Sequence, residues 1–263
     1  MKDYSPDLYD EYKKETLLSS FKKETKKQNT LLPDSTTKPE FTGLSTLKNT
    51  VRCDKLDPNH PALKYLYSRK FNTNEIRRLL YTDDFKSVAS QINEESSKKL
   101  LDNEPRIIIP FYDTESKIKL IQGRALKESK MKYITIKQHD DVDKIYGEEN
   151  IDPSKIKYVV EGPLDSLFVN NCIATCDANL IRSDADVLIF DNQPRNKEVV
   201  SLMQQAINEG RSLVIWPNSP DSKQDINDMI KSGISKELLM QVIKQCTFSG
   251  IVAQLKFNQW KKV

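Results

Sequence analysis

Short apolar strands alternate with helical patterns in the second half of the chain, and this alternation limits the possible folds more than any other feature. The segments that read as strands are 156–160, 173–175, 186–190 and 212–216, and helical patterns cover 163–169, 197–209, 226–231 and 236–244. Near-continuous apolar strands separated by helices are typical of a parallel sheet that helices cover on both faces. We therefore expect an α/β fold here, with a ligand site at the carboxyl ends of the strands.

The first half of the chain predicts a smaller α+β arrangement. Strand patterns cover 106–112, 116–125 and 132–137, and helical patterns cover 61–69 and 73–80, with Thr73 placed to cap the second helix. Residues 1–50 show a helical pattern only over 8–27 and are otherwise irregular. The expected regions are an irregular N-terminal segment over 1–50, a small basic α+β subdomain over 51–150, the α/β domain over 151–235, and a C-terminal helix and strand over 236–263.

Composition excludes several functional classes. The 263 residues contain no run of about 18 apolar residues, so we expect no membrane-spanning helix and no membrane partner. The N-terminus lacks the apolar core of a secretory signal and four cysteines do not make a disulfide framework, so we expect a cytoplasmic protein, in the host cytoplasm if the chain is viral. Two histidines offer little for a histidine-rich metal site, and no P-loop motif occurs, so we expect no P-loop NTPase domain.

One stretch of the first half is strongly basic although the whole chain carries a net charge of only +3. Between residues 116 and 138 a single acid, Glu128, stands against seven basic residues: Lys117, Lys119, Arg124, Lys127, Lys130, Lys132 and Lys137. Such a surface can bind a polyanion. It can equally be the solvated face of a hairpin, and charge alone leaves both interpretations open.

Carboxylates collect where the predicted strands of the second half end. They are Glu161 after the first strand, Asp165 in the helical turn that follows it, Asp191 after the third strand, and Asp225 and Asp228 after the fourth. The carboxyl ends of parallel strands meet at one edge of a sheet, where several carboxylates repel one another unless a cation or shared protons intervene. Oxygen ligands without a nearby histidine or cysteine favour Mg²⁺ or Mn²⁺.

Some of these acids have a simpler explanation. Asp225 could cap the helix that begins at 226, with Asp228 at the third helical position, and Asp165 could be an ordinary acid of a first helical turn. Glu161 and Asp191 have no capping role, because each directly follows a predicted strand. The combination is therefore more specific than any one of its members.

Three of these segments together resemble the Toprim domain, which bacterial-type primases, topoisomerases and some nucleases share. They are Glu-Gly-Pro-Leu-Asp at 161–165, the strand-end Asp191, and Lys-x-Asp-Ile-Asn-Asp at 223–228. Other segments resemble the DnaG-like primases, and T-even-type phage primases in particular: 106–111, 122–124 and 132–134 for the basic subdomain, and 60–66, 191–198 and 255–261 for the phage proteins. The resemblance runs from about Tyr9 to the C-terminus and implies a Toprim-type parallel sheet flanked by helices.

The resemblance implies a DNA primase, which makes short RNA primers on single-stranded DNA for phage replication by nucleotidyl transfer with Mg²⁺ or Mn²⁺. It implies that the catalytic acids are Glu161, Asp165, Asp191 and Asp225, and that the metal ligands are Glu161, Asp191, Asp225 and Asp228. Glu161 would be the general base or an acid that organises the metal, supported by Asp165. The residues that would hold nucleotide phosphates or the template are Arg106, Arg124, Lys127 and Lys132. Arg195 lies at a predicted helix start, where a cation opposes the helix dipole, and this fits either a phosphate-binding residue or an ordinary solvated arginine. The implied partners are single-stranded DNA, ribonucleoside triphosphates and a separate replicative helicase.

Two departures from the family pattern affect this interpretation. The Toprim signature usually has a second acid two residues after the strand-end aspartate, where this chain has Gln193. These primases also begin with a zinc-binding module of paired cysteines, and this sequence has no Cys-x-x-Cys pair. We therefore expect no zinc in this chain, four buried and inert thiols, and a separate zinc-binding primase polypeptide as a candidate partner.

Two other functional classes remain open on the sequence. One is a Toprim nuclease or topoisomerase, although a topoisomerase would need a further domain that presents a nucleophilic tyrosine. The other is a non-catalytic remnant of a primase that binds the helicase or single strands, which Gln193 and the missing zinc module favour.

Overall fold

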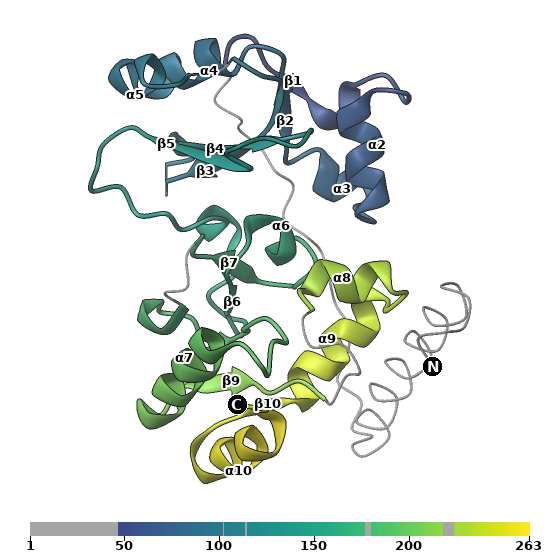
Figure 1. Ribbon diagram of the computed structural model, residues 1–263, viewed down its shortest axis with the longest axis vertical. Coiled ribbons are helices and arrows are strands. Elements are labelled where there is room, and N and C mark those ends of the chain that lie inside the picture. Colours follow the sequence, from purple (N-terminus) through teal and green to yellow (C-terminus); the bar gives the residue numbers. More distant parts are fainter. Residues whose placement is uncertain (1–46, 102, 114, 177–179, 218–223) are drawn as a thin grey trace. The chain divides into compact units, whose positions relative to one another are not determined.

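The computed structural model describes residues 47–263 apart from 102, 114, 177–179 and 218–223 (Figure 1). This part of the chain divides after Ile151 into two compact units. We refer to the described residues up to Ile151 as the N-terminal unit and to Asp152–Val263 as the C-terminal unit. The predicted helix over 8–27 lies outside the described residues.

The N-terminal unit is built on a five-stranded antiparallel sheet in the order β1-β2-β3-β4-β5. Its strands are β1 (Val51–Arg52), β2 (Leu80–Thr82), β3 (Arg106–Tyr112), β4 (Ile118–Ala125) and β5 (Tyr133–Lys137). The three longer strands confirm the predicted ones. The sequence did not predict β1 and β2, because two or three residues are too few to show an alternating pattern.

Helices accompany this sheet, and the residues around α3 show why that helix begins and ends where it does. The helices are α2 (Pro61–Ser68), α3 (Thr73–Ile76), α4 (Phe85–Ile92) and α5 (Glu94–Lys98). The predicted cap of α3 was wrong by one residue, because Asn72 and Glu75 form a reciprocal capping box that makes Thr73 the first helical residue. The predicted extension of α3 to residue 80 was also wrong, since Leu80 pairs with Ile108 as the start of β2.

One hydrophobic cluster fixes α4 on the sheet. Phe85 and Val88 of α4 are buried against Ile108 of β3 and Ile121 of β4. Gly123 lies directly under the Phe85 ring, and a Cβ atom at this position would come within 2.7 Å of the Phe85 Cζ atom. The glycine of the Gln-Gly-Arg segment is therefore required by close packing between a strand and a helix.

The C-terminal unit contains the predicted parallel sheet, in the order β10-β9-β8-β6-β7. Its strands are β6 (Tyr158–Val160), β7 (Cys172–Ala174), β8 (Val187–Leu188), β9 (Ser212–Val214) and β10 (Thr247–Phe248). β6 to β9 run parallel to their neighbours, and β10 is an antiparallel edge strand on β9. The sheet confirms the α/β prediction. β8 and β9 end at Leu188 and Val214, two residues before their apolar runs end, whereas β6 ends with its run at Val160.

The helices of this unit are α6 (Pro163–Ser166), α7 (Lys197–Asn208), α8 (Ile226–Lys231), α9 (Lys236–Gln245) and α10 (Gly250–Trp260) (Figure 1). The C-terminal elements belong to the same unit, since β10 pairs with β9 and α10 packs against α7 and β9. Across the described ranges, no helix combines the length and apolar character that crossing a membrane requires.

Candidate active site

Three neighbouring parallel strands bring the predicted acids to one edge of the C-terminal sheet. β6 lies between β7 and β8, and β9 follows β8, so the carboxyl ends of β6, β8 and β9 are adjacent. Glu161 directly follows β6 and is exposed to solvent. Asp191 follows β8, and Asp225 begins the helix after β9, both partly exposed. The sequence correctly placed these three carboxylates at the same edge.

The loop that carries Asp191 is held to the segment that carries Asp225. Asn192 and Gln224 pair through two backbone hydrogen bonds, 2.9 and 3.1 Å between N and O, and both side chains are buried. Asp191 and Asp225 are the residues directly next to this pair. The backbone pairing therefore brings Asp191 and Asp225 next to each other, although they are more than 30 residues apart in the sequence.

Gln193 is part of the same loop and is 8% exposed. Its Nε2 donates to Asp191 Oδ2 at 2.9 Å, and its Oε1 accepts from Asn196 Nδ2 at 2.8 Å. Asn196 in turn caps α7 by accepting from the Glu198 amide. Gln193 therefore joins the Asp191 carboxylate to the start of α7, and its oxygen is engaged by Asn196.

Asp165 connects the first strand end to α8. Its Oδ1 accepts a hydrogen bond from the Asn227 amide at 3.1 Å. Its other oxygen lies over Gly162, where a Cβ atom would come within 2.6 Å of Oδ2. Gly162 is therefore the residue that lets Asp165 fold back at the start of α6, and Asp165 does more than supply charge to a first helical turn.

Asp225 does cap α8, as one interpretation of the sequence held: its Oδ1 accepts from the Asp228 amide at 2.6 Å. Asp228 points outward, and its side chain is 51% exposed, with Lys231 Nζ 4.0 Å from Oδ1. No three His, Cys, Asp or Glu side chains of the described chain are arranged to hold a metal ion. Asp191 and Asp225 still fit Mg²⁺ by their chemistry, because Mg²⁺ is usually held by one or two carboxylates together with waters and substrate phosphates.

The basic residues of the N-terminal unit fall into two kinds. Arg106 is 1% exposed, and its guanidinium donates to the carbonyl oxygens of Gly123 at 2.8 Å and Met131 at 2.9 Å and pairs with Glu104. Burial lowers the pKa of Arg106, although Glu104 opposes this. Its Nη1 and Nη2 atoms hold the β4–β5 connection to the sheet, whereas its buried Nε, like that of Arg124, has no hydrogen-bond partner. This geometry differs from the expectation that Arg106 holds phosphates.

Arg124 has the opposite surroundings. It is 7% exposed, and its guanidinium carbon lies 5.0 Å from the Tyr65 ring centroid and 4.9 Å from that of Tyr133. It donates to the Tyr133 hydroxyl, but its buried Nε has no hydrogen-bond partner and no described carboxylate pairs with it. A buried cation without a counter-charge is costly, and an anion would relieve that cost.

Arg69 is a second cation at this position that the sequence did not single out. Its Nη1 donates to the Tyr65 hydroxyl at 3.2 Å, and its guanidinium carbon lies 5.9 Å from the Tyr65 ring centroid. Burial raises the pKa of Tyr133, and both Arg124 and Arg69 act against that rise. The four-residue spacing of Tyr65 and Arg69 on a helix was the only available signal.

The other predicted basic residues lie at the surface. Lys127 and Lys132 are exposed in the connection between β4 and β5, and Arg195 is exposed just before α7.

The four cysteines only partly match the expectation that all of their thiols are buried. Cys53 and Cys246 are buried, whereas Cys172, the first residue of β7, and Cys176, two residues beyond β7, are partly exposed.

Comparison with known proteins gives one relative along the whole chain. No protein-family model matches the sequence. The DNA primase of Enterobacteria phage T4 is 33% identical over 270 residues, which cover all of this chain and 78% of the relative. Conservation at that level over the full length indicates common ancestry rather than a shared motif.

Solved primase structures share the fold at low sequence identity. The zinc-binding and RNA polymerase domains of the Aquifex aeolicus primase match with a TM-score of 0.53 and 20% identity, over 72% of this chain and 57% of that one. The catalytic core of the E. coli primase matches with a TM-score of 0.52 and 17% identity, over 70% of this chain and 72% of that one. With the relationship to the T4 protein, these findings place the chain: it belongs to the DnaG-like phage DNA primases.

Proposed function

We propose that this chain synthesises short RNA primers on a single-stranded DNA template, and that the transfer takes place at the carboxyl edge of the C-terminal sheet. The relationship to the T4 DNA primase supports the activity. A structural neighbour, the DnaG primase catalytic domain, has been solved bound to single-stranded DNA, which supports the template. The observation that carries the site is the Asn192–Gln224 pairing, which places Asp191 and Asp225 on bonded neighbouring segments.

In the proposed reaction the 3′-hydroxyl of one ribonucleotide attacks the α-phosphorus of an incoming ribonucleoside triphosphate, and pyrophosphate leaves. Asp191 and Asp225 would hold the divalent ion. When bound, the ion neutralises the triphosphate and lowers the pKa of the attacking hydroxyl. Glu161 is exposed at the neighbouring strand end and would accept the hydroxyl proton. Asp165 would keep α8, and with it Asp225, in place through Asn227.

Arg124 is the proposed phosphate ligand of the N-terminal unit. Its guanidinium is buried and has no carboxylate partner among the described residues, and a phosphate offers the charge and the acceptor geometry that it lacks. Lys127 and Lys132 would attract the template backbone from the surface, and Arg195 would do the same next to Asp191. Arg106 is left out of the proposed set because its Nη1 and Nη2 atoms already bond to the Gly123 and Met131 carbonyl oxygens and Glu104 balances its charge.

Two partners are proposed on chemical grounds. One is a replicative helicase, which would unwind the template with a P-loop motor, a motif that residues 1–263 do not contain. The other is a zinc-binding primase polypeptide, whose paired cysteines would help to recognise the start site. Host cytoplasm is the proposed compartment.

The test is incorporation of labelled ribonucleotides on single-stranded DNA with Mg²⁺, with and without a short RNA primer and the replicative helicase. We expect RNA of primer length to form with Mg²⁺, and no RNA to form when EDTA is present from the start. Cleavage of the DNA in the absence of nucleotides would instead support the alternative that the chain is a Toprim nuclease. Binding of single strands with neither reaction, at any Mg²⁺ or Mn²⁺ concentration, would support a non-catalytic module.

A further inference from the structure

Both tryptophans of the chain make hydrogen bonds to the residues on either side of Asp191. The indole Nε1 of Trp216, two residues beyond β9, donates to the Phe190 carbonyl oxygen at 2.7 Å. The indole Nε1 of Trp260, the last residue of α10, donates to Asn192 Oδ1 at 3.0 Å. Two separate segments thus hold the residues before and after one carboxylate.

The Asp191 loop receives further support from the end of α10. Asn192 already pairs with Gln224 through its backbone, so the bond from Trp260 fixes its side chain as well. The Lys262 amide donates to the Pro194 carbonyl oxygen at 2.8 Å. The end of α10 therefore contacts the loop at two points, and both are hydrogen bonds rather than apolar packing.

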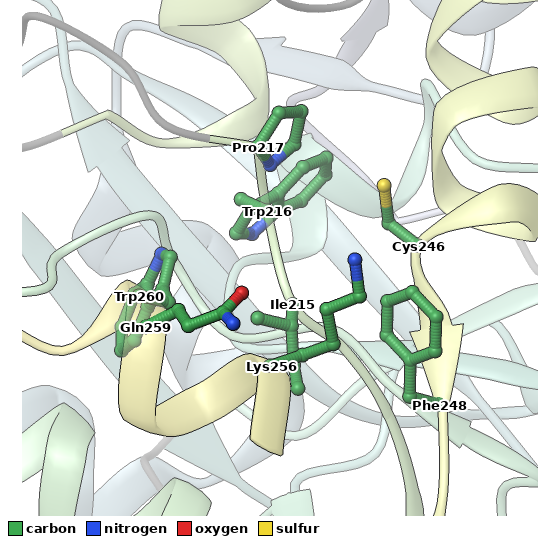
Figure 2. Close-up of a pocket in the computed structure, with 8 residues that line it drawn as sticks. All are labelled: Ile215, Trp216, Pro217, Cys246, Phe248, Lys256, Gln259 and Trp260. Atoms are coloured by element: carbon green, nitrogen blue, oxygen red, sulfur yellow. The ribbon is translucent and has the colours of Figure 1, made fainter. Parts of the chain in front are cut away.

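The two tryptophans also line one small pocket, together with Lys256, Gln259 and Phe248 (Figure 2). Both indoles are buried, with 2% and 3% of their surface exposed, and the Trp260 ring stacks on Phe257 at 6.0 Å between ring centroids. Packing therefore holds each ring in its plane, and the N–H bond selects the direction in which the ring points.

A buried indole N–H usually finds a partner simply to avoid the cost of being unsatisfied. That need does not explain why both indoles, from segments 44 residues apart, reach the two neighbours of the same acid. We infer that Trp216 and Trp260 are positioning residues that fix the direction of the Asp191 carboxylate for metal binding. This inference rests on the proposed role of Asp191 as a metal ligand.

The test replaces each tryptophan with phenylalanine, which removes the N–H donor and keeps an aromatic ring. We expect Trp260→Phe and Trp216→Phe to weaken Mn²⁺ binding, measured by calorimetry without nucleotides, by about tenfold. The Mg²⁺ concentration for half-maximal primer synthesis should rise by a similar factor, while the rate at saturating Mg²⁺ recovers most of its value. A residue needed only for folding would lower the melting temperature without this metal dependence.

A second readout uses the tryptophans themselves. Because Trp216 and Trp260 are the only tryptophans in the chain, Mn²⁺ or Mg²⁺ binding at Asp191 should change the intrinsic emission of the protein. Asp191→Asn should abolish that change, and each single phenylalanine variant should retain only the response of the remaining indole.

The matched control is Gln254→Ala. Gln254 joins α10 to Gln204 of α7 through side-chain hydrogen bonds of 2.7 and 3.2 Å, so the variant loosens the same helix without touching the Asp191 loop. It should leave Mn²⁺ affinity unchanged. Asn192→Ala should weaken binding as Trp260→Phe does, and the double variant should be no weaker than Asn192→Ala alone.

The outcomes separate the inference from the function on which it rests. Unchanged Mn²⁺ affinity in both phenylalanine variants, with binding lost in Asp191→Asn, would overturn the positioning role alone. Unchanged Mn²⁺ affinity in Asp191→Asn would overturn the metal-ligand role of Asp191, and the positioning role would fall with it.

Discussion

The side-chain amide of Gln193 donates a hydrogen bond to the carboxylate of Asp191, with 2.9 Å between Nε2 and Oδ2. A second carboxylate at position 193 would repel Asp191 in this geometry, whereas the amide stabilises it without an ion. The amide oxygen accepts from Asn196, which leaves one of its two lone pairs for any other ligand. Gln193 therefore does not supply the second negative charge of the family pattern, and instead fixes the orientation of the Asp191 carboxylate.

The first prediction concerns Gln193→Glu. Without metal, the variant should unfold more easily by about 1–3 kcal/mol, because a buried hydrogen bond becomes a repulsion between carboxylates. Saturating Mg²⁺ should raise its melting temperature more than it raises that of the wild type, since the ion relieves the repulsion. Thermal unfolding with and without Mg²⁺ measures both effects.

Gln241→Glu is the control for Gln193→Glu, since Gln241 is an exposed residue of α9 and the charge change is the same. It should show neither effect. An equal response to Mg²⁺ in both glutamate variants would contradict a specific site at Asp191.

The second prediction is that Asp191→Asn abolishes primer synthesis and leaves the fold intact. The change removes a negative charge from an edge where several acids meet, so the melting temperature without metal should stay the same or rise. Activity should fall by at least about a hundredfold at saturating Mg²⁺, because charge compensation of the triphosphate is a major part of phosphoryl transfer.

Asp184→Asn is the matched control for this variant. Asp184 precedes β8, at the other end of the same strand, and is 78% exposed beside Lys157. Its activity should equal that of the wild type. Full activity in Asp191→Asn, or a large loss of stability, would instead give Asp191 a structural role.

The third prediction contrasts two buried arginines on neighbouring strands. Arg106→Met should destabilise the protein by about 3–5 kcal/mol, because it leaves Glu104 and two carbonyl oxygens without their partner. Arg124→Met should cost little stability or increase it, because it removes a buried charge that no described carboxylate balances. Urea unfolding of the two variants provides the comparison.

Nucleotide and single-strand binding should respond mainly to Arg124. Arg124→Met and Lys132→Ala should weaken binding, and the difference from wild type should shrink at high salt, because phosphate contacts release counterions. Binding that is unchanged in both variants at low salt would return the basic stretch to the interpretation of a solvated face.

The fourth prediction concerns packing under α4. Gly123→Ala should destabilise the N-terminal unit by about 1–3 kcal/mol, because the added methyl group meets the Phe85 ring. Gly210→Ala is the comparison, since nothing lies within 4 Å of its added Cβ and only its φ of +75° opposes the change. The free energy of unfolding of Gly210→Ala should fall by about 1 kcal/mol. Equal losses in denaturant melts would contradict the packing argument.

Local pattern was enough to predict the order of the main elements and the edge where the acids meet. The three runs 156–160, 186–190 and 212–216 each span five residues, enough to indicate strands that are covered on both faces, and a parallel sheet follows from the helices between them. The position of Glu161 and Asp191 directly after such runs places them at the carboxyl edge whatever the details of packing. The same pattern could not predict β1 or β2, which are too short to carry a period.

Only the tertiary structure decided which partners each polar side chain binds. Arg106 and Arg124 look alike in the sequence, yet the first pairs with Glu104 and bonds to carbonyl groups of residues 123 and 131, and the second lies between the rings of Tyr65 and Tyr133. Asp165 bonds to an amide 62 residues away, and Trp260 reaches a side chain 68 residues before it. Periodicity reports how buried a position is, whereas hydrogen-bond partners depend on which distant segments the fold brings within about 3 Å.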